Sequence, residues 1–414
     1  MGDRPPFGPP AGNLPQHALP RRSPTRPRAL AETVATFRRW LHLDDPAPVQ
    51  VLAAAIVANL AEGDPVWLLF VSAPATGKTE LVSAAAGLPY VHPVATLTEP
   101  ALLSGSPKRE QAKDATGGVL RQVGEFGILL AKDFTSVLAQ NRDTRDRALA
   151  ALREISDGKW DRPMGADGGR VLHWAGKCGF IGGVTPALDS YHRVISQLGD
   201  RFLLLRLPDV DPERAGVMAL GHRGKEKVMR AELADALAGL VEHADHGKVN
   251  RELGDDERTR LIRLATFTAR ARTGVDRDSY TKEVTYLPQV EGVGRLVIAY
   301  ARLLGGLEAI GCDPDTTWTI LARVAVDCLP AIRAQIIPVL LAGQERLGGG
   351  TSPVRTSEVA EQLGMATKNV RPHLEDLTLL RLATRTKSSD ADNAADLWTP
   401  TAWLREHWPP ESST

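Results

Sequence analysis

Residues 66–87 most constrain what this 414-residue chain can fold into. A short, continuous apolar run from Val66 to Val71 has the pattern of a strand that is buried on both faces. A tight, turn-forming segment follows, Ser72-Ala73-Pro74-Ala75-Thr76-Gly77-Lys78-Thr79, and then a helix-forming run that ends at Gly87. Strand, loop and helix in this order indicate an α/β unit with the loop at the carboxyl end of a buried strand.

The loop has the residues that phosphate binding requires. Gly77 lets the backbone turn where a Cβ would clash, so the loop amides and the helix N-terminus can face an anion. Lys78 can reach the β- and γ-phosphates, and Thr79 can offer its hydroxyl to Mg²⁺. The loop therefore predicts binding of ATP with Mg²⁺ through Ser72, Ala75, Thr76, Gly77, Lys78, Thr79 and Glu80.

One position departs from the usual pattern of such loops. The strict pattern begins with Gly, whereas this loop begins with Ser72, a small residue that is compatible with a turn. The alternative interpretation is a chance match in a Gly/Ala-rich turn. The flanking strand and helix favour the phosphate loop over that alternative.

Composition sets broad limits on the rest of the chain. The length is typical of two to three domains, and 50 Lys and Arg balance 50 Asp and Glu, so any basic surface must be local. The three cysteines, Cys178, Cys312 and Cys328, are too scattered for a disulfide framework or a metal site and are expected to be buried thiols. Apolar runs are shorter than the ~18–20 residues that span a bilayer, and no apolar signal core is present, which predicts a cytoplasmic protein with no membrane partner.

The first 28 residues are rich in Pro, Arg and Gly. Such a composition buries too little apolar surface to offset the entropy of ordering, so residues 1–28 are predicted to be a disordered tail. The tail carries four arginines that could contact nucleic acid or an acidic partner, or could simply be solvated: Arg21, Arg22, Arg26 and Arg28.

A second apolar run, from Phe126 to Ala131, ends next to an acidic residue. It has the features of the strand whose carboxylate holds Mg²⁺ or its water. Lys132-Asp133 stands where two acids are usual, so two interpretations remain open. Asp133 is the metal-side acid with the base lost to Phe134, or Asp133 is the catalytic acid with Lys132 in the metal-side position. Both interpretations predict slow hydrolysis.

Further polar residues follow in a readable order. Residues 157–174 suggest a β-hairpin, an apolar strand then ends at Thr185, and Arg201 immediately precedes another apolar strand. Together with the phosphate loop and the acidic strand, this order resembles the AAA+ ATPases over about residues 45–345. Within them it is closest to the branch that has a hairpin before the sensor strand, which includes the minichromosome-maintenance helicases.

The resemblance implies a role for particular residues. Thr185 would sense the γ-phosphate, although a strand-end Thr beside a turn is the alternative. Arg201 would be the arginine finger that reaches the nucleotide of a neighbouring subunit, which requires a hexameric ring or a filament, although an ordinary surface arginine is the alternative. Glu154 lies in a helix that resembles one in those helicases and could partly replace the missing carboxylate.

The resemblance also sets the expected fold class and domains. It implies an α/β AAA+ P-loop core with a parallel sheet over residues 29–210, then a helical lid over residues 211–347. Arg295, at a predicted helix start in the lid, would be a second sensor that contacts the γ-phosphate, with Arg302 as its rival and a solvent-exposed arginine as the alternative. The pattern after residue 211 is wholly helical, as a lid requires.

Residues 351–414 resemble a winged helix-turn-helix domain. Two short helices, the second over residues 366–377, precede two candidate strands of a wing at residues 380–386 and 396–399. Thr367, Lys368, Asn369 and Arg371 are expected to face outward from the second helix and to contact DNA, as is His373. The alternative is that the domain binds protein.

Three functions fit these features. The first is an oligomeric ATPase that acts on DNA in replication, helicase loading or element mobility, with a hairpin around Trp160–Trp174 facing a central pore. The second is a transcription regulator that nucleotide binding gates, with little hydrolysis. The third is a remodeller of protein partners that uses the winged helix for docking.

Overall fold

The computed structural model describes residues 25–41, 43–104, 117–164, 169–197, 201–278, 280–281, 283–286, 289–343, 352–389 and 394–409. Its centre is a five-stranded parallel sheet in the order β2-β3-β6-β1-β7. The strands are β1 (Trp67–Val71), β2 (Val91–Val94), β3 (Phe126–Ala131), β6 (Lys177–Val184) and β7 (Phe202–Arg206). The predicted α/β class with a parallel sheet is confirmed.

The strand register determines which loops meet. Val71, the last residue of β1, lies beside Val184 of β6 and Arg206 of β7. Ala131, the last residue of β3, lies beside Gly182. Because the strands are parallel, the segments that follow β1, β3, β6 and β7 all emerge at one edge, which is where α/β sheets bind ligands.

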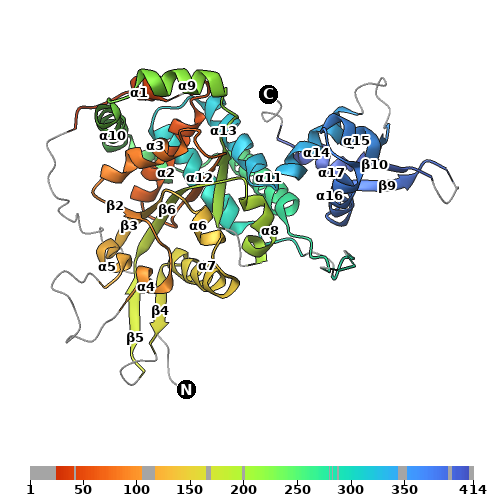
Figure 1. Ribbon diagram of the computed structural model, residues 1–414, viewed down its shortest axis with the longest axis horizontal. Coiled ribbons are helices and arrows are strands. Elements are labelled where there is room, and N and C mark those ends of the chain that lie inside the picture. The colour runs from red at the N-terminus through yellow and green to blue at the C-terminus, as the bar shows by residue number, and fades with distance from the viewer. Residues whose placement is uncertain are drawn as a thin grey trace.

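Helices and one hairpin surround the sheet (Figure 1). All but one residue of α2 are buried, as expected for a helix that is apolar on all sides and lies within a core. The elements in this part of the chain are α1 (Leu30–Trp40), α2 (Ala47–Leu60), α3 (Lys78–Ser83), the 3-10 turn η1 (Ala84–Gly87), α4 (Glu99–Leu102), α5 (Val119–Val123), α6 (Thr135–Leu138), α7 (Arg142–Ser156), the antiparallel pair β4 (Lys159–Pro163) and β5 (Val171–Ala175), and α8 (Leu188–Gln197).

The hairpin of β4 and β5 protrudes from the core at the bottom of Figure 1. Its large aromatic side chains do not project, because Trp160 and Trp174 are both buried and the Trp174 indole donates to Gly124 O at 2.9 Å. The two tryptophans therefore anchor the base of the hairpin, and the prediction that the hairpin faces a central pore stays a prediction.

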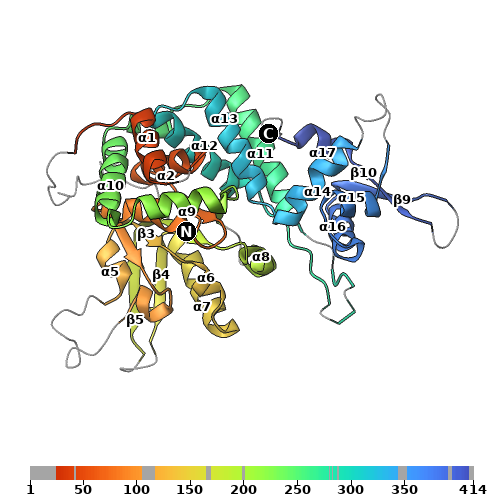
Figure 2. The same cartoon turned by 45° about the horizontal axis from the view of Figure 1, so that its top comes forward.

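The region after β7 is helical, as predicted. It contains α9 (Pro212–Gly221), α10 (Glu226–Glu242), η3 (His246–Asn250), α11 (Asp255–Arg272), α12 (Gly294–Ala309), α13 (Pro314–Asp327) and α14 (Ala331–Ala342). α13 and α14 are separate helices, because Pro330 lacks the N–H that a continuous helix would need there. α9 runs over the surface and has no buried residue (Figure 2).

The C-terminal domain lies at one end of the long axis of the molecule (Figure 1). It consists of β8 (Val354–Arg355), α15 (Thr356–Gln362), α16 (Thr367–Leu379), β9 (Ala383–Lys387), β10 (Asp396–Pro400) and α17 (Ala402–His407). The small sheet has the order β8-β10-β9, and β10 pairs antiparallel with both neighbours. Two helices followed by an antiparallel pair of strands form the predicted winged helix-turn-helix arrangement.

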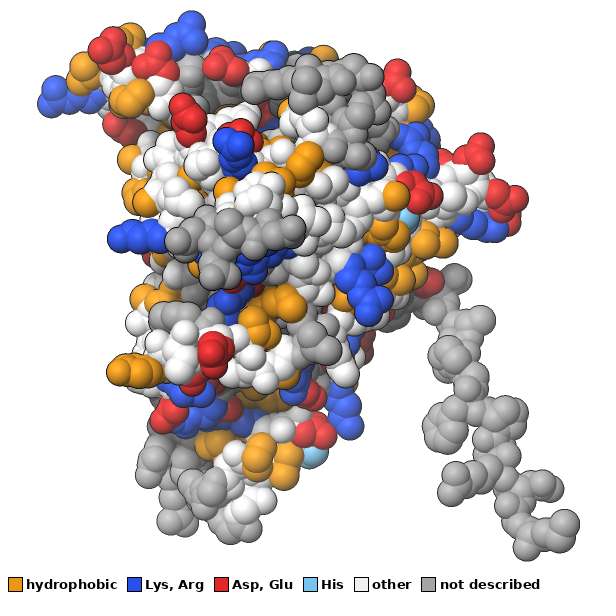
Figure 3. Space-filling view, turned by 90° about the vertical axis from the view of Figure 1, so that its right-hand side faces the viewer, with side chains coloured by type: hydrophobic (Ala, Val, Ile, Leu, Met, Phe, Trp, Pro, Cys, Tyr) orange, Lys and Arg blue, Asp and Glu red, His pale blue; other side chains and the backbone are white. Residues whose placement is uncertain are grey.

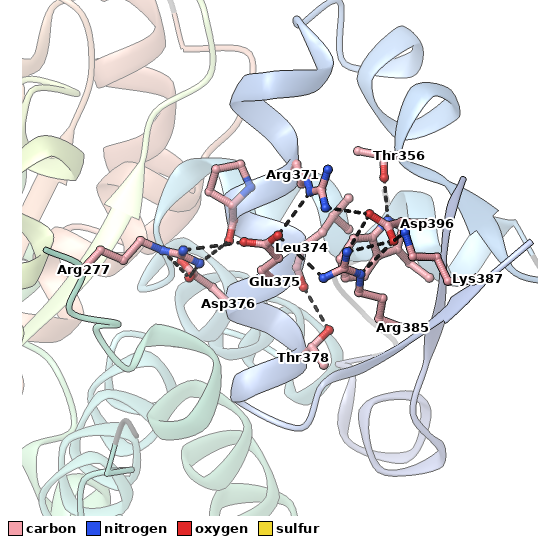
Figure 4. Close-up of polar contacts among 12 residues, drawn as sticks. Arg277, Thr356, Arg371, Leu374, Glu375, Asp376, Thr378, Arg385, Lys387 and Asp396 are labelled. Atoms are coloured by element: carbon pink, nitrogen blue, oxygen red, sulfur yellow. Dashed lines mark hydrogen bonds and ion pairs between the residues drawn. The ribbon is translucent and has the colours of Figure 1, made fainter. Parts of the chain in front are cut away.

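This domain shares an apolar core with α14 and the end of α11. Phe267 and Ile336 pack in the same buried cluster as Leu374 and Trp398. A buried carboxylate joins this domain to the helical region, since Asp376 accepts from Arg333 of α14 at 3.2 Å. Asp376 also accepts from Arg277 at 2.7 Å (Figure 4). The winged helix is thus packed against the helical region.

The end of the predicted tail also packs on the core. Arg28 donates to Glu32 at 2.7 Å and to Asp235 of α10 at 2.9 Å, and Arg26 pairs with Glu32 at 3.2 Å. These two arginines are therefore engaged within the chain, whereas Arg21 and Arg22 lie outside the described residues.

Within the described part of the chain, no single helix combines the length and the apolar composition needed to cross a membrane; α13 and α14 do so only when taken together across a 113° bend.

Candidate nucleotide-binding site

The phosphate loop joins β1 to α3 in the conformation that its sequence predicts. Gly77, directly before α3, has a φ of 83°, a left-handed value that favours glycine. Ala75 also has a positive φ, 64°, which is uncommon for a residue with a Cβ. The two left-handed residues turn the chain sharply between strand and helix, so Lys78 and Thr79 begin α3 beside the sheet edge.

Ser72 occupies the place of the usual first glycine. It is 4% exposed, and its hydroxyl lies 2.7 Å from the hydroxyl of Thr76. The hydroxyl pair links the first and fifth residues of the loop and closes it across its base. The departure from the sequence pattern is thus accommodated by a hydrogen bond that glycine could not make.

Lys78 lies across the ends of two strands. Its side chain is largely buried, and Nζ donates to Ser72 O at 2.9 Å and to Val184 O at 2.6 Å. Burial lowers the pKa of Lys78, and the negative charge of Asp133 opposes that shift. Gly183 provides the space, since a Cβ there would lie 3.1 Å from Lys78 Cδ and 3.0 Å from Lys132 O.

Asp133 lies on the same edge, two residues after β3. Its Oδ1 accepts from the backbone N–H of Thr135 at 2.9 Å, which fixes its orientation. Lys132 is exposed, whereas Phe134 is fully buried against Phe180 and Phe202. Of the three residues that follow β3, only Asp133 has a carboxylate, and it is exposed at the sheet edge.

Thr185 follows β6, the strand between β1 and β3. Its backbone N–H donates to Thr135 Oγ1 at 2.9 Å, and the Thr135 hydroxyl donates to Thr185 Oγ1 at 3.2 Å. The sheet therefore brings Lys78, Asp133 and Thr185 to one edge. Thr135 was not predicted, and its only signal in the sequence is a hydroxyl two residues after the acid.

A second unpredicted residue, Arg230 of α10, lies over the helix of the phosphate loop. Its guanidinium pairs with both carboxylate oxygens of Glu80, at 2.7 Å and 3.0 Å. Glu80 was expected to contact the nucleotide, but the structure shows it engaged with the helical region. No local pattern could have found a partner 150 residues away.

A cavity of about 400 Å³ opens beside the phosphate loop. It is lined by Arg38, Leu41, Leu43, Asp44 and Met218. Leu41 connects it to the loop, because a Cβ on Gly77 would lie 3.9 Å from Leu41 Cδ2. Leu41, Leu43 and Met218 give this cavity apolar walls, and Arg38 and Asp44 give it charged ones.

Arg201 and Arg295 lie away from the phosphate loop of their own chain. Arg201 and Arg295 line a second cavity, of about 460 Å³, together with Trp67, the first residue of β1. The phosphate loop begins after the last residue of β1, so the length of that strand separates the two sites. The expectation that Arg295 contacts the γ-phosphate within its own chain is therefore wrong.

Arg201 is held within its own chain. Its Nη2 lies 2.8 Å from both carboxylate oxygens of Asp157, and its side chain is only 10% exposed. Lys177 lies in the same cavity, where burial, with the nearby charge of Arg302, lowers its pKa to about 7. The cavity thus gathers cationic side chains at the edge of the sheet opposite the phosphate loop.

Two other expectations fail for reasons of position. Arg302 is buried and donates to Ala58 O, Ala61 O and Glu62 O, so it stabilises the end of α2 rather than a phosphate. Glu154 is exposed on the last turn of α7, three residues before Asp157, and so lies toward the edge opposite Asp133. It cannot replace a carboxylate beside Asp133.

The described residues hold no cluster of three or more His, Cys, Asp or Glu side chains that could bind a metal on its own. The groups near the loop nevertheless suit Mg²⁺ held partly by phosphates, since this ion needs one or two protein oxygens in such sites. Thr79 and Asp133 are the residues that would supply them.

The predicted DNA-contacting residues lie on one exposed segment. Thr367, Lys368, Asn369 and Arg371 are all exposed at the start of α16. His373 is only partly exposed, and burial lowers its pKa. On the face that the C-terminal domain presents, Lys and Arg side chains are interspersed with acidic and apolar ones (Figure 3).

Comparisons with known proteins place the chain only distantly. A scan against protein-family models finds no match, and neither does a search of curated proteins. Solved structures that match include the apo C-terminal region of NrS-1 (14% identity, 91% of this chain and 77% of that chain, TM-score 0.29). The active helicase Cch of SCCmec type IV matches at 10% identity over 90% of this chain and 71% of that chain, with a TM-score of 0.31.

The Orc1 protein of Aeropyrum pernix in complex with DNA matches at 16% identity over 89% of this chain and 95% of that chain, with a TM-score of 0.25. At such TM-scores the comparisons carry no argument about function. The α/β fold with its five-stranded parallel sheet, helical region and small C-terminal sheet stands on the strand order and the phosphate loop.

Proposed function

We propose that this chain is an AAA+ ATPase that binds ATP with Mg²⁺, assembles into a hexameric ring or a filament, and acts on DNA in replication, helicase loading or element mobility. The observation that supports it best is the meeting of Lys78, Asp133 and Thr185 at one sheet edge. Lys78 for phosphate binding, Asp133 for the metal and Thr185 for sensing each follow a different strand, namely β1, β3 and β6. In this proposal nucleotide state controls assembly and DNA binding.

Each residue has a defined part in nucleotide binding. Lys78 exchanges its two carbonyl partners for phosphate oxygens, which costs little because its charge is already desolvated. Thr79 and Asp133 hold Mg²⁺, which when bound neutralises charge on the phosphates. Thr185, fixed by Thr135, presents its hydroxyl to the terminal phosphate.

The cavity at the opposite edge supports the assembly part of the proposal. Arg201 and Arg295 are too far from the loop of their own chain, so they can meet a terminal phosphate only on a neighbouring copy. Arg295 is exposed and available for such a contact. Arg201 must exchange Asp157 for phosphate, one anion for another, so its charge stays paired.

One observation favours the second function, a nucleotide-gated DNA-binding regulator with little hydrolysis. The residue after Asp133 is Phe134, which has no carboxylate and is buried. Glu154 lies on the last turn of α7, far from Asp133. Neither residue therefore supplies a second acid beside Asp133. A lone acid can hold the metal or activate water but does not do both well. Slow turnover would make the bound triphosphate a lasting signal rather than a fuel.

The experiment compares wild type with Lys78→Ala, Arg201→Ala and Arg295→Ala by mass photometry in ATP and in ADP. We expect wild type to assemble in ATP, Lys78→Ala to lose ATP binding and assembly, and both arginine variants to bind ATP yet assemble at least about ten-fold more weakly, the equivalent of ~1.4 kcal/mol. Lys227→Ala, which removes an exposed lysine from α10, is the control.

Duplex DNA binding is measured on the same samples at low salt, where phosphate contacts are strongest. Identical mass distributions in ATP and ADP would rule out the assembly claim. Absence of DNA binding under every condition would rule out the DNA claim.

A further inference from the structure

Three cationic side chains meet where α16 joins the wing, and one carboxylate contacts all of them (Figure 4). Asp396, the first residue of β10, pairs with Arg371 of α16 at 3.1 Å. It also accepts from Arg385 of β9 at 2.9 Å through each of its oxygens, and pairs with Lys387 at 3.2 Å. We call Arg371, Arg385 and Lys387 the junction cations.

The charges of this group are arranged in depth. The Asp396 side chain is only 6% exposed, whereas those of Arg371 and Lys387 are each 49% exposed and that of Arg385 is 33% exposed. A carboxylate thus lies beneath a layer of cations. A ligand that approaches from solvent meets the positive charges first.

Asp396 stays ionised despite its burial. Burial acts to raise its pKa, but hydrogen bonds from Arg385 and Lys387 outweigh it and hold the pKa below the usual value. An ionised carboxylate makes charge-assisted hydrogen bonds, which are stronger and more directional than neutral ones.

Neighbouring groups restrain the cations further. Glu375, one turn after Arg371 on α16, accepts from Arg371 at 3.2 Å. The guanidinium of Arg385 lies over the buried ring of Trp398, 5.5 Å from its centroid. Three cations and two carboxylates leave the group with one net positive charge, and the rotamers of the cations are largely fixed.

We propose that the junction cations form a preorganised platform for the phosphate backbone of duplex DNA, and that Asp396 is the positioning residue that holds them. This inference rests on the DNA binding proposed above. The platform continues from the exposed start of α16, since Arg371 lies one turn after Thr367, and crosses onto β9. A row of cations that spans a helix and a neighbouring strand matches an extended polyanion, and fixed side chains lose little entropy on binding.

In this arrangement Arg371 contributes to affinity rather than to sequence recognition. Phosphate contacts fix register and orientation, whereas base edges specify sequence. Lys368 and Asn369 are exposed in the first turn of α16 and are the residues that would approach the bases.

The test measures binding of the full chain to a fluorescent duplex by anisotropy at several salt concentrations. Arg385→Ala and Lys387→Ala should each weaken binding to unrelated duplexes alike and reduce the slope of log K against log salt by about 1. Lys227→Ala, on α10, removes the same charge elsewhere and should leave both quantities unchanged.

The decisive comparison is Asp396→Asn with Glu361→Gln. Both variants remove one negative charge from the C-terminal domain, but Glu361 is exposed on α15, a helix that carries none of the junction cations. If Asp396 positions the cations, Asp396→Asn weakens binding several-fold although the protein becomes more positive, whereas Glu361→Gln leaves binding equal or slightly stronger.

Several results would overturn the inference. Tighter binding by Asp396→Asn, matching Glu361→Gln, would show that Asp396 only repels DNA. Lys387 is half exposed, so Lys387→Ala should remain folded. If this variant keeps the wild-type affinity and salt slope, the platform proposal is wrong, although DNA binding itself still stands. A wild-type chain that binds no duplex would overturn both this inference and the proposed DNA function.

Discussion

At the scale of single residues, the phosphate loop shows how one side chain depends on the backbone around it. Lys78 reaches its position only because Gly183 has no side chain where the lysine crosses β6. Ser72 and Thr76 close the loop with a hydroxyl pair instead of a glycine turn. The position of the key lysine is therefore set by a residue about a hundred positions away in the sequence.

Gly183→Ala should displace Lys78. The added Cβ would lie 3.0 Å from Lys132 O and 3.1 Å from Lys78 Cδ, both closer than such contacts normally are. We expect a loss of about 1–3 kcal/mol in the free energy of unfolding. We also expect about a ten-fold weaker affinity for ATP, measured by isothermal titration calorimetry.

The control for this change is Gly216→Ala, on the exposed helix α9, where nothing lies within 4 Å of the added Cβ. It should leave ATP affinity unchanged and stabilise the helix by about 0.5–1 kcal/mol. Unchanged ATP affinity in a folded Gly183→Ala protein would contradict the role given to Gly183.

At the scale of elements, buried ion contacts join helices that the sequence separates. α2 is apolar on all sides and ends in carbonyl groups with no partner inside the helix. Arg302 of α12 donates to Ala58 O in the last turn of α2 and to Ala61 O and Glu62 O just beyond it, and its positive charge lies where the helix dipole is negative. Arg302, the rival of Arg295 for the second sensor that the resemblance implies, is instead a cap at the end of a core helix.

Arg302→Met should therefore be strongly destabilising. Methionine fills much of the same volume but removes the Arg302 donor from Ala58 O, and leaves Ala61 O and Glu62 O to their second donors, Lys177 and Asn250. We expect a loss of about 3 kcal/mol in the free energy of unfolding in urea. Arg295→Met, in the first turn of the same helix, is exposed and should change stability by no more than about 0.5 kcal/mol. Equal effects of the two changes would show that the carbonyl contacts of Arg302 contribute little.

At the scale of the whole molecule, a charge network connects the sheet, the helical region and the segment before α2. Asp327, at the end of α13, accepts from the backbone N–H of Arg206 in β7 at 2.8 Å. Arg206 also pairs with Asp189 of α8 at 2.8 Å, and Arg323 pairs with Asp45. These residues lie at the edge of the sheet that carries the phosphate loop.

This network should make stability depend on pH. Burial raises the pKa of Asp327 to about 6, above the value of about 3.9 in an unfolded chain. The stability that protonated Asp327 gives is present below about pH 4 and is lost as the pH rises through about 6, with a size on the order of 2–3 kcal/mol. Asparagine keeps the acceptor for Arg206 but does not titrate.

The measurement is urea unfolding of wild type and Asp327→Asn between about pH 4 and pH 7. The stability of wild type relative to the variant should fall across this range. Arg323 also pairs with Asp327 itself, at 3.6 Å. A constant difference, or one that grows with pH because this ion pair dominates, would contradict the raised pKa.

Much of the site could be predicted because its signals are local. The phosphate loop, the acid after β3 and the threonine after β6 each lie next to an apolar run, and parallel strands bring such ends to one edge. Glu154, Arg295 and Arg302 were placed wrongly because each lies on a helix whose position follows from packing. Arg230 and Thr135 were missed for the same reason, since their partners lie far away in the sequence.

The C-terminal domain divides in the same way. The two helices and the strand pair were readable from turn residues and apolar spacing, and the exposed start of α16 was predicted correctly. The buried contact of Asp376 with Arg333 and the cluster around Asp396 were not, because charged residues in a sequence give no sign of which ones will be buried together.

By itself, the sequence determined the order of strands and helices, the phosphate loop and the polar residues at strand ends, because these depend on local apolar patterns and backbone preferences. Tertiary structure alone decided which arginines line a cavity and which hold the fold together. Arg201, Arg302 and Arg371 look alike along the chain, and only packing determines that a carboxylate, a helix end or a wing lies beside each.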